Sequence, residues 1–208
     1  MWQGNKNMHD GLSRDHVKNV FMKGRGFGID SLGRIRVAEL IKEKGFKNVL
    51  DMPCCNCVMY EVLKKYIPNI DYYGSDLTAQ MLNVSKELFP ELGDRLSQGY
   101  IQKTVFSDNK FDVVIARHIF EHIPDWRDAM SECMRIAREF VYYVFYIPPG
   151  DQEHIQLVNN ATGNYCLNTY REVDVIEQFM GRKYQKYIEI SDKTNAGKTT
   201  DVIYEVAK

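Results

Sequence analysis

The chain has 208 residues and a formal net charge of -1, so it suits one α/β domain and carries no global basic field that would attract nucleic acid. Hydrophobic residues make up 44% of the sequence and charged residues 26%, a balance that excludes a disordered chain. The longest apolar run, residues 140–147, has the length of a strand, which excludes a membrane-spanning helix.

The cysteines and the first residues indicate a cytoplasmic protein. The sequence has five cysteines, and three of them, Cys54, Cys55 and Cys57, fall within one short turn where neighbours cannot easily bridge one another. This spacing suits reduced thiols better than a secreted disulfide framework. The N-terminus also lacks the basic-then-apolar pattern of a secretory signal. We therefore expect a cytoplasmic location and no membrane partner.

Residues 1–30 are polar and rich in glycine, and they are predicted to form an arm or lid before the sheet. Two interpretations stay open: a solvated surface tail with some helix, or a cover over the cofactor in which Lys23 or Arg25 reaches a carboxylate. Ser31 is predicted to cap a helix that runs to Lys44, and Gly45 is predicted to end it.

The next elements alternate between strand and helix, and two of the strands end in a carboxylate. Strands are predicted over residues 48–51 and 71–76, and helices over 58–66 and 78–88. Asp51 and Asp76 close the two strands, at the edge where open α/β sheets bind cofactors. The second acid can accept both hydroxyls of a ribose, and the competing interpretation is that such an acid is an ordinary helix cap.

The turn after the first strand carries a resemblance. Val49-Leu50-Asp51-Met52-Pro53-Cys54-Cys55-Asn56-Cys57 resembles the first motif of class I S-adenosylmethionine (SAM) dependent methyltransferases of the methyltransferase-11-like type. That motif is read as two hydrophobic residues followed by Asp-x-Gly-Cys-Gly-x-Gly. Pro53 in place of the first glycine is a known variant of the family. Cys55 and Cys57 replace two further glycines, which in the family permit positive φ and close approach of the backbone to the ligand.

Three later stretches extend the resemblance. Residues 73–82 are similar to the family's second motif, in which the acid, here Asp76, binds ribose and a Met-Leu pair follows. Residues 99–106 occupy the third motif, where Tyr100 stands in place of an Asp that commonly meets the adenine amino group. Residues 111–124 are similar to the fourth strand and the Glu-His sequence after it.

The remaining elements complete the predicted fold. We expect a helix over 126–138, a strand over 140–147, a substrate-side loop over 151–169, a helix over 171–180, and strands over 183–190 and 200–207 joined by a turn. Two adjacent strands at the end of an alternating pattern imply an antiparallel hairpin. The family that the motifs resemble has a seven-stranded sheet ending in such a reversed strand. The resemblance therefore implies a three-layer, Rossmann-like α/β fold with a seven-stranded, mostly parallel sheet, and we expect one domain over residues 1–208.

Two patterns invite a metal interpretation that the sequence does not favour. The crowded cysteines lack the two well-spaced pairs of a structural zinc site. His118-Ile119-Phe120-Glu121-His122 fits an inverted zinc-protease pattern, but it follows a buried strand instead of lying on a helix, and no third ligand is apparent. We predict no metal site.

The resemblance implies a SAM-dependent methyltransferase acting on an unidentified small-molecule acceptor. The Asn-Pro-Pro-aromatic motif of amino-group nucleic-acid methyltransferases is absent, because the fourth strand ends in Ala116-Arg117-His118. His118, His122 and His154 are candidate bases, with a structural role as the competing interpretation of each, and His118 and His122 are the predicted catalytic residues. The residues expected to bind the cofactor are Asp51, Pro53, Cys54, Cys55, Asp76, Leu77, Met81, Tyr100, Ile101 and Arg117.

An alternative function rests on three departures from the family pattern. If the side chains of Cys55, Cys57 and Tyr100 fill the cofactor channel, the sheet stays intact while the cofactor cannot enter. The chain would then be a binding or regulatory protein on a methyltransferase fold with an impaired SAM site. A nucleotide- or NAD-linked enzyme is less well supported, because the first turn lacks the glycine fingerprint of that class.

Overall fold

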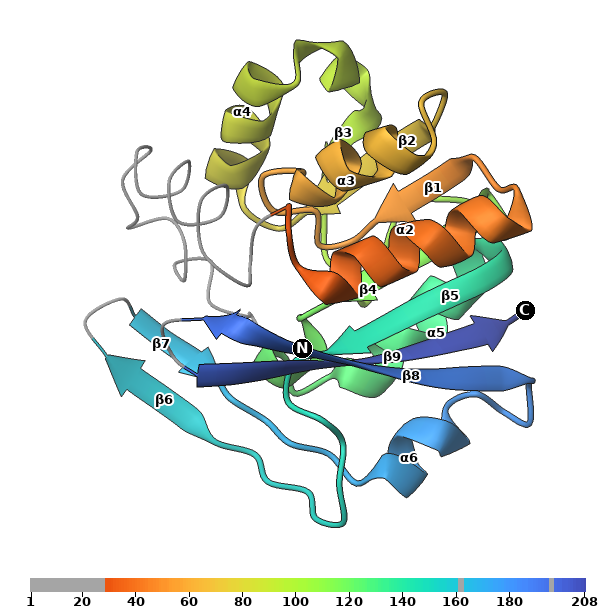
Figure 1. Ribbon diagram of the computed structural model, residues 1–208. Helices are drawn as coiled ribbons and strands as arrows, with labels where there is room; N and C mark the ends of the chain where they lie inside the picture. Colours follow the sequence, from red (N-terminus) through yellow and green to blue (C-terminus); the bar gives the residue numbers. More distant parts are fainter. Residues whose placement is uncertain (1–28, 161–162, 195–196) are drawn as a thin grey trace.

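The computed structural model describes residues 29–160, 163–194 and 197–208 (Figure 1). Within them, seven strands form one sheet in the order β3-β2-β1-β4-β5-β9-β8. The first five strands in that order pair in parallel, whereas β9 runs antiparallel to both β5 and β8. This order confirms the predicted seven-stranded, mostly parallel sheet with a reversed strand from the C-terminal hairpin.

The elements follow one another as strand and helix for most of the chain. The sheet strands are β1 (Asn48–Asp51), β2 (Asp71–Asp76), β3 (Leu96–Gln98), β4 (Phe111–Arg117), β5 (Ala137–Phe145), β8 (Tyr184–Thr194) and β9 (Gly197–Ala207). The helices are α2 (Leu32–Lys44), α3 (Val58–Tyr66), α4 (Ala79–Leu88), α5 (Trp126–Ile136) and α6 (Glu172–Glu177), with 3-10 turns η1 (Pro90–Arg95) and η2 (Phe120–His122).

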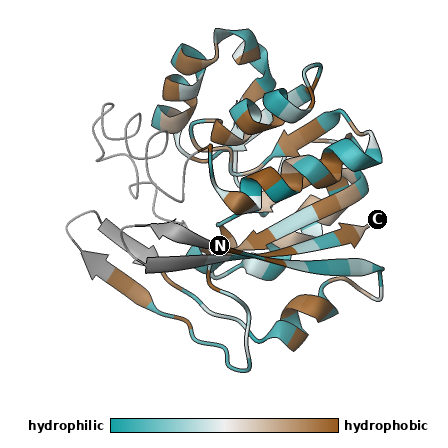
Figure 2. Ribbon diagram, in the orientation of Figure 1, coloured by the Kyte–Doolittle hydropathy of each residue, from teal (hydrophilic) through white to brown (hydrophobic). Residues whose placement is uncertain are grey.

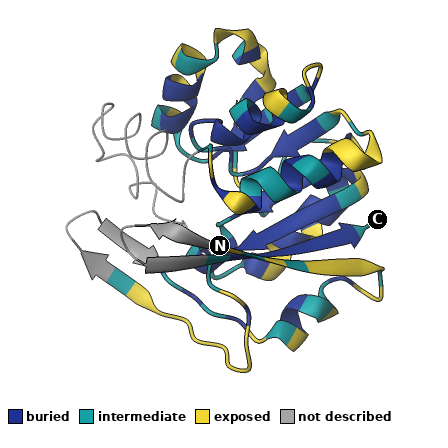
Figure 3. Ribbon diagram, viewed as in Figure 1, coloured by how far each residue is buried: buried dark blue, intermediate teal, exposed yellow. Residues whose placement is uncertain are grey.

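The sheet has a hydrophobic core on each face, and β4 contributes to both. Val113 and Ile115 pack into the core under α2 and α3, whereas Val114 and Ala116 join the core under α5 and α6. All four side chains are fully buried, as expected for a parallel strand covered on both faces. Figures 2 and 3 show hydrophobic and buried residues along β1 and β5, the two strands that flank β4. Burying each larger side chain contributes about 1.5–3 kcal/mol, so this strand fixes the centre of the fold.

The predicted ends of α2 are confirmed. Ser31 precedes the helix with an extended backbone, and Gly45 follows it with φ 75°, in the left-handed region that favours glycine. Two lysines in the last turn, Lys42 and Lys44, suit the negative end of the helix dipole. Ser31 accepts a hydrogen bond from Arg117 at the carboxyl end of β4, and Lys44 contacts Phe140 in the first half of β5, so the helix runs from the carboxyl edge of the sheet toward the opposite edge.

The structure differs from the sequence prediction in three places, where the strand residues show little alternation of apolar and polar side chains. β3 was not predicted, since three residues are too few to show alternation. Residues 151–169, predicted as a loop, contain a hairpin of β6 (Leu157–Asn160) and β7 (Gly163–Cys166). The turn predicted between the last two strands is much shorter, because β8 and β9 continue as a paired ribbon whose backbone hydrogen bonds need no apolar residues.

Smaller differences concern the ends of elements. β5 begins at Ala137, directly after α5, so the predicted helix over 126–138 is two residues too long. α6 spans Glu172–Glu177 and is shorter than predicted. The predicted arm lies outside the described residues except for residues 29 and 30. No helix in the described part of the chain is long and apolar enough to cross a membrane.

Candidate active site

The two predicted acids lie at the same edge of the sheet. β1 and β2 are neighbouring parallel strands, and each ends at its acid, with Asp51 in register with Gly74. The hydroxyl of Tyr72 donates a hydrogen bond to Oδ2 of Asp51, at 2.7 Å. Burial raises the pKa of Asp51 to about 7, although Tyr72 and two arginines nearby act in the opposite direction. This carboxyl group therefore changes its charge near neutral pH.

The turn after β1 keeps the backbone shape of the family's glycines. Cys55 has φ 49° and Cys57 has φ 59°, so both cysteines adopt the left-handed conformation. A residue with a Cβ in this conformation costs roughly 1–2 kcal/mol relative to the right-handed region. Cys57 is also the residue that precedes α3. The two substitutions therefore preserve the path of the turn and add backbone strain to it.

The thiols of this turn point into the protein interior. Cys54 and Cys57 belong to the core under α2 and α3, and Cys55 packs against Met81 and Val84 of α4. Burial raises the pKa of Cys55, so its thiol stays neutral. The hypothesis that sulfur atoms plug the cofactor channel finds no support in this packing.

Gly74 on β2 makes room for one of the sulfurs. A Cβ at Gly74 would lie 2.9 Å from Sγ of Cys54 and 2.8 Å from a methyl carbon of Leu96, closer than real Cβ atoms approach. Position 74 therefore accepts only glycine while Cys54 occupies this place in the core.

Asp76 connects the first turn to α4. Its Oδ2 accepts a hydrogen bond from the backbone N–H of Cys55 at 2.9 Å, and its Oδ1 accepts one from the N–H of Thr78 at 2.8 Å. Burial raises the pKa of Asp76, and these backbone hydrogen bonds act against the rise. The predicted ribose-binding acid thus also holds the turn against the helix.

A narrow cleft opens beside Asp76 at the carboxyl edge of the sheet. Its volume is about 50 Å³. Among the described residues, it is lined by Met52, Pro53, Ser75, Asp76, Leu77, Gly99, Tyr100, Ile101, Gln102, Ile119 and Ile123. The structure thus brings together five of the ten predicted cofactor residues: Pro53, Asp76, Leu77, Tyr100 and Ile101. The lining is mostly apolar with one acid, which is the composition that an adenosyl group needs.

The other five predicted cofactor residues lie around the cleft without lining it. Asp51 is buried beneath the turn, Cys54 and Cys55 face the interior, and Met81 is fully buried in α4. Arg117 at the end of β4 binds Asp201 instead. Six lining residues are not among the predicted cofactor residues, and all are neighbours of predicted residues or follow β4: Met52, Ser75, Gly99, Gln102, Ile119 and Ile123.

Arg117 and His118 are held by an acid from the distant strand β9. Nη2 of Arg117 donates to Oδ2 of Asp201 at 3.0 Å and to Oγ of Ser31 at 3.2 Å. Nε2 of His118 lies 2.8 Å from Oδ1 of Asp201. Burial and the Arg117 charge lower the pKa of His118 to about 3, so the ring is neutral and donates to the carboxylate.

Asp201 stays ionised in this cluster, and α2 makes space for it. Burial alone would raise the pKa of Asp201. The hydrogen bond from His118 and the charge of Arg117 instead hold this pKa well below its usual range. A Cβ at Gly33 would lie 2.0 Å from Oδ2 of Asp201, so only glycine fits in the first turn of α2. Because Nε2 of His118 donates its proton to Asp201, this nitrogen is not positioned to accept one, which argues against the predicted role of His118 as a base.

His122 has a different environment and a defined tautomer. Its Nδ1 lies 2.9 Å from the carbonyl oxygen of Cys166, which only accepts hydrogen bonds, so Nδ1 carries the proton. Nε2 is then an acceptor, and the hydroxyl of Tyr146 lies 3.3 Å from it. Burial lowers the pKa of His122, so the imidazole is neutral at pH 7. This pair can take up a proton.

Glu121 fixes the segment that carries His122. It is fully buried, and its Oε1 accepts hydrogen bonds from the backbone N–H groups of Tyr146 at 2.8 Å and Ile147 at 3.3 Å. Its Oε2 has no hydrogen-bond partner among the described residues. Burial raises the pKa of Glu121 to about 7. The side chain thus ties η2 to the end of β5 and places His122 beside Tyr146.

Comparisons with known proteins agree with this arrangement. Residues 50–145 match the family model for a methyltransferase domain. Over 112 residues the chain is 28% identical to the demethylmenaquinone methyltransferase of Thermotoga maritima, covering 54% of this chain and 48% of that protein. Over 124 residues it is 27% identical to a ubiquinone biosynthesis O-methyltransferase of Methylococcus capsulatus, covering 58% and 47%. The chain spans about half the length of these curated relatives.

Solved structures show the same fold. A SAM-dependent methyltransferase from Aquifex aeolicus superposes with a TM-score of 0.58 at 15% identity, covering 95% of this chain and 100% of that chain. The PH0226 protein from Pyrococcus horikoshii gives a TM-score of 0.64 at 17% identity, with the same coverage of both chains.

The strand order and the cleft at the carboxyl edge define a class I methyltransferase fold. Together with the family match, they confirm the resemblance read from the motifs. Residues 50–145 match the methyltransferase-domain family, and the fold of the described chain is similar to that of a SAM-dependent methyltransferase.

Proposed function

We propose that this chain methylates a hydroxyl group of a small molecule, using SAM. The observation that carries the proposal is the cleft beside Asp76, which combines one acid with apolar walls while the substituted cysteines face away from it. SAM supplies a methyl group bonded to a sulfonium, which is a good leaving group. The protein then mainly needs to hold both reactants in a water-poor site and to remove a proton.

Asp76 and the walls of the cleft would hold the adenosyl group. The carboxylate of Asp76 suits ribose hydroxyls, and Leu77, Tyr100 and Ile101 suit a flat, largely apolar base. The cleft is smaller than the roughly 300–1,000 Å³ of typical small-molecule sites, so binding must widen it. Tyr100 is 38% exposed, which makes its side chain the wall that can move.

His122 and Tyr146 supply the proton acceptor. SAM would supply the methyl group and leave as S-adenosylhomocysteine. The hydroxyl proton of the acceptor would pass to Tyr146, whose own proton would move to Nε2 of His122. The Cys166 carbonyl keeps Nδ1 protonated, so Nε2 is the ring nitrogen that would receive that proton. A hydroxyl acceptor is also consistent with the name of one relative, a ubiquinone biosynthesis O-methyltransferase.

Isothermal titration with SAM and with its demethylated product, S-adenosylhomocysteine, tests the cofactor site. We expect micromolar dissociation constants for both. Absence of heat at millimolar concentration would favour the alternative function, a binding or regulatory protein with an impaired SAM site.

The acceptor class needs its own test. Catechol and hydroquinone are incubated with the protein and SAM, and the masses of the products are measured by mass spectrometry. We expect the mass gain of one methyl substitution with at least one of these phenols, and loss of that product in the His122→Asn variant. Cofactor binding without any methylated phenol would reject the hydroxyl acceptor while leaving the cofactor assignment intact.

Two further features belong to this proposal. Five cysteines, Cys54, Cys55, Cys57, Cys133 and Cys166, are free thiols in the structure, which supports a reducing, cytoplasmic location. The organisation as one domain over residues 1–208 is likewise proposed from length and fold.

A further inference from the structure

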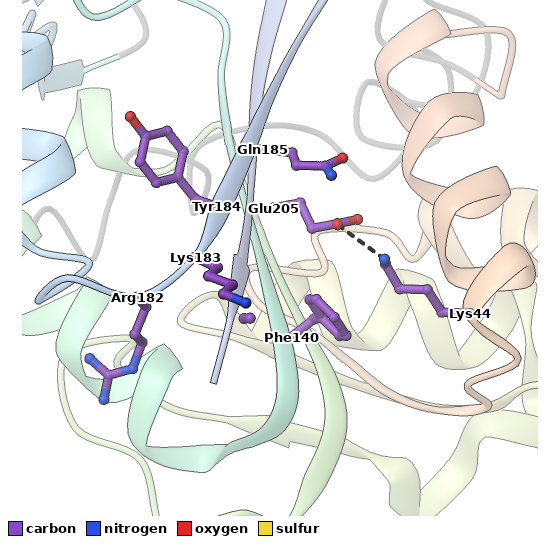
Figure 4. Close-up of a pocket in the computed structure, with 8 residues that line it drawn as sticks. Lys44, Phe140, Arg182, Lys183, Tyr184, Gln185 and Glu205 are labelled. Carbon is purple, nitrogen blue, oxygen red and sulfur yellow. Dashed lines mark ion pairs between the residues drawn. The ribbon is translucent and has the colours of Figure 1, made fainter.

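A second cavity lies at the edge of the sheet opposite to the methyl-transfer cleft. Its volume is about 560 Å³, within the range of small-molecule sites. Lys44 at the end of α2, Phe140 of β5, Tyr184 at the start of β8 and Glu205 near the end of β9 form its walls (Figure 4). Nothing in the proposed methyl transfer uses this cavity, since the cleft for that reaction lies where β1, β2 and β4 end.

The single carboxylate in the described lining is already neutralised. Glu205 is buried, and its Oε1 lies 3.1 Å from Nζ of Lys44. Its Oε2 accepts a hydrogen bond from the hydroxyl of Tyr142, at 2.9 Å. Nζ of Lys44 also lies 4.4 Å from the centre of the Phe140 ring, which adds a cation–π contact. Both carboxylate oxygens are therefore occupied, and the wall presents little negative charge to a ligand.

Two further cations leave the cavity with a positive surplus. Arg182 and Lys183 line it, and neither forms an ion pair with a carboxylate of the described residues. Figure 4 shows the side chain of Lys183 extending toward Phe140, with Arg182 at the other side of the cavity from Lys44. A hydrogen bond to the Phe179 carbonyl, at 3.3 Å, engages Nη1 of Arg182 and leaves its other nitrogens available.

We propose that this cavity binds a small organic anion. Arg182 and Lys183 hold its carboxylate or phosphate group, because a guanidinium fork and an ammonium group are the donors that such oxygens prefer. Phe140 and Tyr184 contact its apolar body; Tyr184 is 41% exposed, so part of its ring is open to a ligand. The ion pair of partly exposed Lys44 with buried Glu205 neutralises this wall, so it does not repel the anion.

The test uses four small probes of similar size on the full chain. Benzoate and phenyl phosphate are the anions, benzyl alcohol is the neutral control and benzylamine is the cationic control. Binding is measured by saturation-transfer NMR and by titration followed through backbone amide shifts. We expect both anions to bind with dissociation constants near or below 1 mM, to move the amide signals of Gln185 and Ala207, and to outbind the two controls at least tenfold. The stronger of the two anions tells whether carboxylate or phosphate is preferred.

Charge variants separate a built site from general attraction. The double variant Arg182→Gln/Lys183→Gln should weaken the binding of both anions at least tenfold. Its matched control, Lys65→Gln/Lys86→Gln, removes the same charge from exposed positions on α3 and α4 and should leave binding unchanged. Both variants alter surface positions, and circular dichroism confirms that each is folded.

Three results would overturn the proposal. The first is absence of saturable binding by both anions, and the second is equal binding of benzyl alcohol. The third is displacement of the anions by S-adenosylhomocysteine together with amide shifts around Asp76, which would place the probes in the methyl-transfer cleft. Because the probes and the amide shifts need no methylation, the result stands apart from the fate of the proposed enzyme activity.

Discussion

The backbone N–H of Cys55 donates a hydrogen bond to Oδ2 of Asp76, at 2.9 Å. The acid predicted to bind ribose is thus also the group that holds the first turn in place, together with its bond to the N–H of Thr78. The folded turn and the proposed cofactor site therefore share one carboxylate, and changing it should affect both.

Replacing Asp76 by asparagine should lower both stability and cofactor affinity. The amide has one acceptor oxygen instead of two, so one backbone N–H loses its partner at a cost of about 1–3 kcal/mol. We expect that loss in urea unfolding and at least a tenfold weaker binding of S-adenosylhomocysteine by calorimetry. Asp94→Asn, at an exposed position of η1, is the matched control and should change neither quantity.

Cys55→Gly should stabilise the protein. Glycine adopts φ near 49° without the Cβ penalty, and the lost thiol is only half-buried against Met81 and Val84. We expect a gain of about 1 kcal/mol in the free energy of unfolding. Cys55→Ala keeps the Cβ and should give no gain. A stabilised alanine variant and an unchanged glycine variant would contradict the assignment of strain to this residue.

Gly33→Ala should destabilise the protein, although alanine usually favours a helix by about 0.5–1 kcal/mol over glycine. The new Cβ would lie 2.0 Å from Oδ2 of Asp201, so the acid must move away from Arg117. We expect a loss of about 1–3 kcal/mol, the usual cost of overpacking, in urea unfolding. Lys42→Ala, at an exposed position of the same helix, should leave stability nearly unchanged.

The stability of the Asp51→Asn variant relative to the wild type should rise with pH. The folded-state pKa of Asp51 is about 7, above its ordinary 3.8, so the folded protein binds a proton that the unfolded chain has lost. The contribution of Asp51 to the free energy of unfolding of the wild type therefore falls as the pH rises from 3.8 to about 7, and it stays constant above about pH 7. Asparagine does not ionise and can still accept the bond from Tyr72.

Urea titrations at pH 5 and pH 7 provide the measurement for Asp51. From pH 5 to pH 7, the unfolding free energy of the Asp51→Asn variant should rise by about 2 kcal/mol relative to that of the wild type. Glu121, whose pKa burial also raises to about 7, is present in both proteins and cancels in the comparison. A difference that is constant with pH would show that Asp51 is ionised throughout.

The pH dependence of catalysis should report His122. Burial lowers its pKa below the ordinary 6.5, so the neutral ring that accepts the proton persists at mildly acidic pH. We expect kcat/KM to stay flat above about pH 6.5 and to fall only below it. His122→Asn should remove this acidic limb together with most of the activity.

Tyr146→Phe provides a narrower test of the same pair. Loss of the hydroxyl breaks the proton path to Nε2 of His122, and we expect kcat to fall at least tenfold with little change in KM. The matched control is Tyr143→Phe, since Tyr143 donates to the Met130 carbonyl in the core, away from this pair. That change should cost about 1 kcal/mol of stability and leave kcat unchanged.

The sequence predicts the sheet and its carboxyl edge well, because strong apolar runs mark the central strands. Asp51 and Asp76 were placed together from the geometry of parallel strands alone, and the structure confirms that placement. The direction of the thiols could not be predicted, because it depends on the left-handed backbone of Cys55 and Cys57. Side-chain type does not determine this conformation.

Long-range contacts of the site leave no trace in the sequence. Asp201 binds Arg117 across 84 positions of the chain, and no local pattern marks it as part of the site. No local sequence pattern indicates the cavity that contains Glu205 and Lys183 either, because its walls come from four separate elements. The choice of His122 over His118 required the positions of their hydrogen-bond partners.

The position of β9 has a consequence for biosynthesis. Among the described strands, β9 is the last in the sequence, yet it lies between β5 and β8 in the sheet. While the ribosome is still making it, β8 has no neighbour to pair with, and Arg117 and His118 lack the acid that later binds them. A nascent chain can therefore form the parallel half of the sheet early, but it completes this part of the site only after its final strand has emerged.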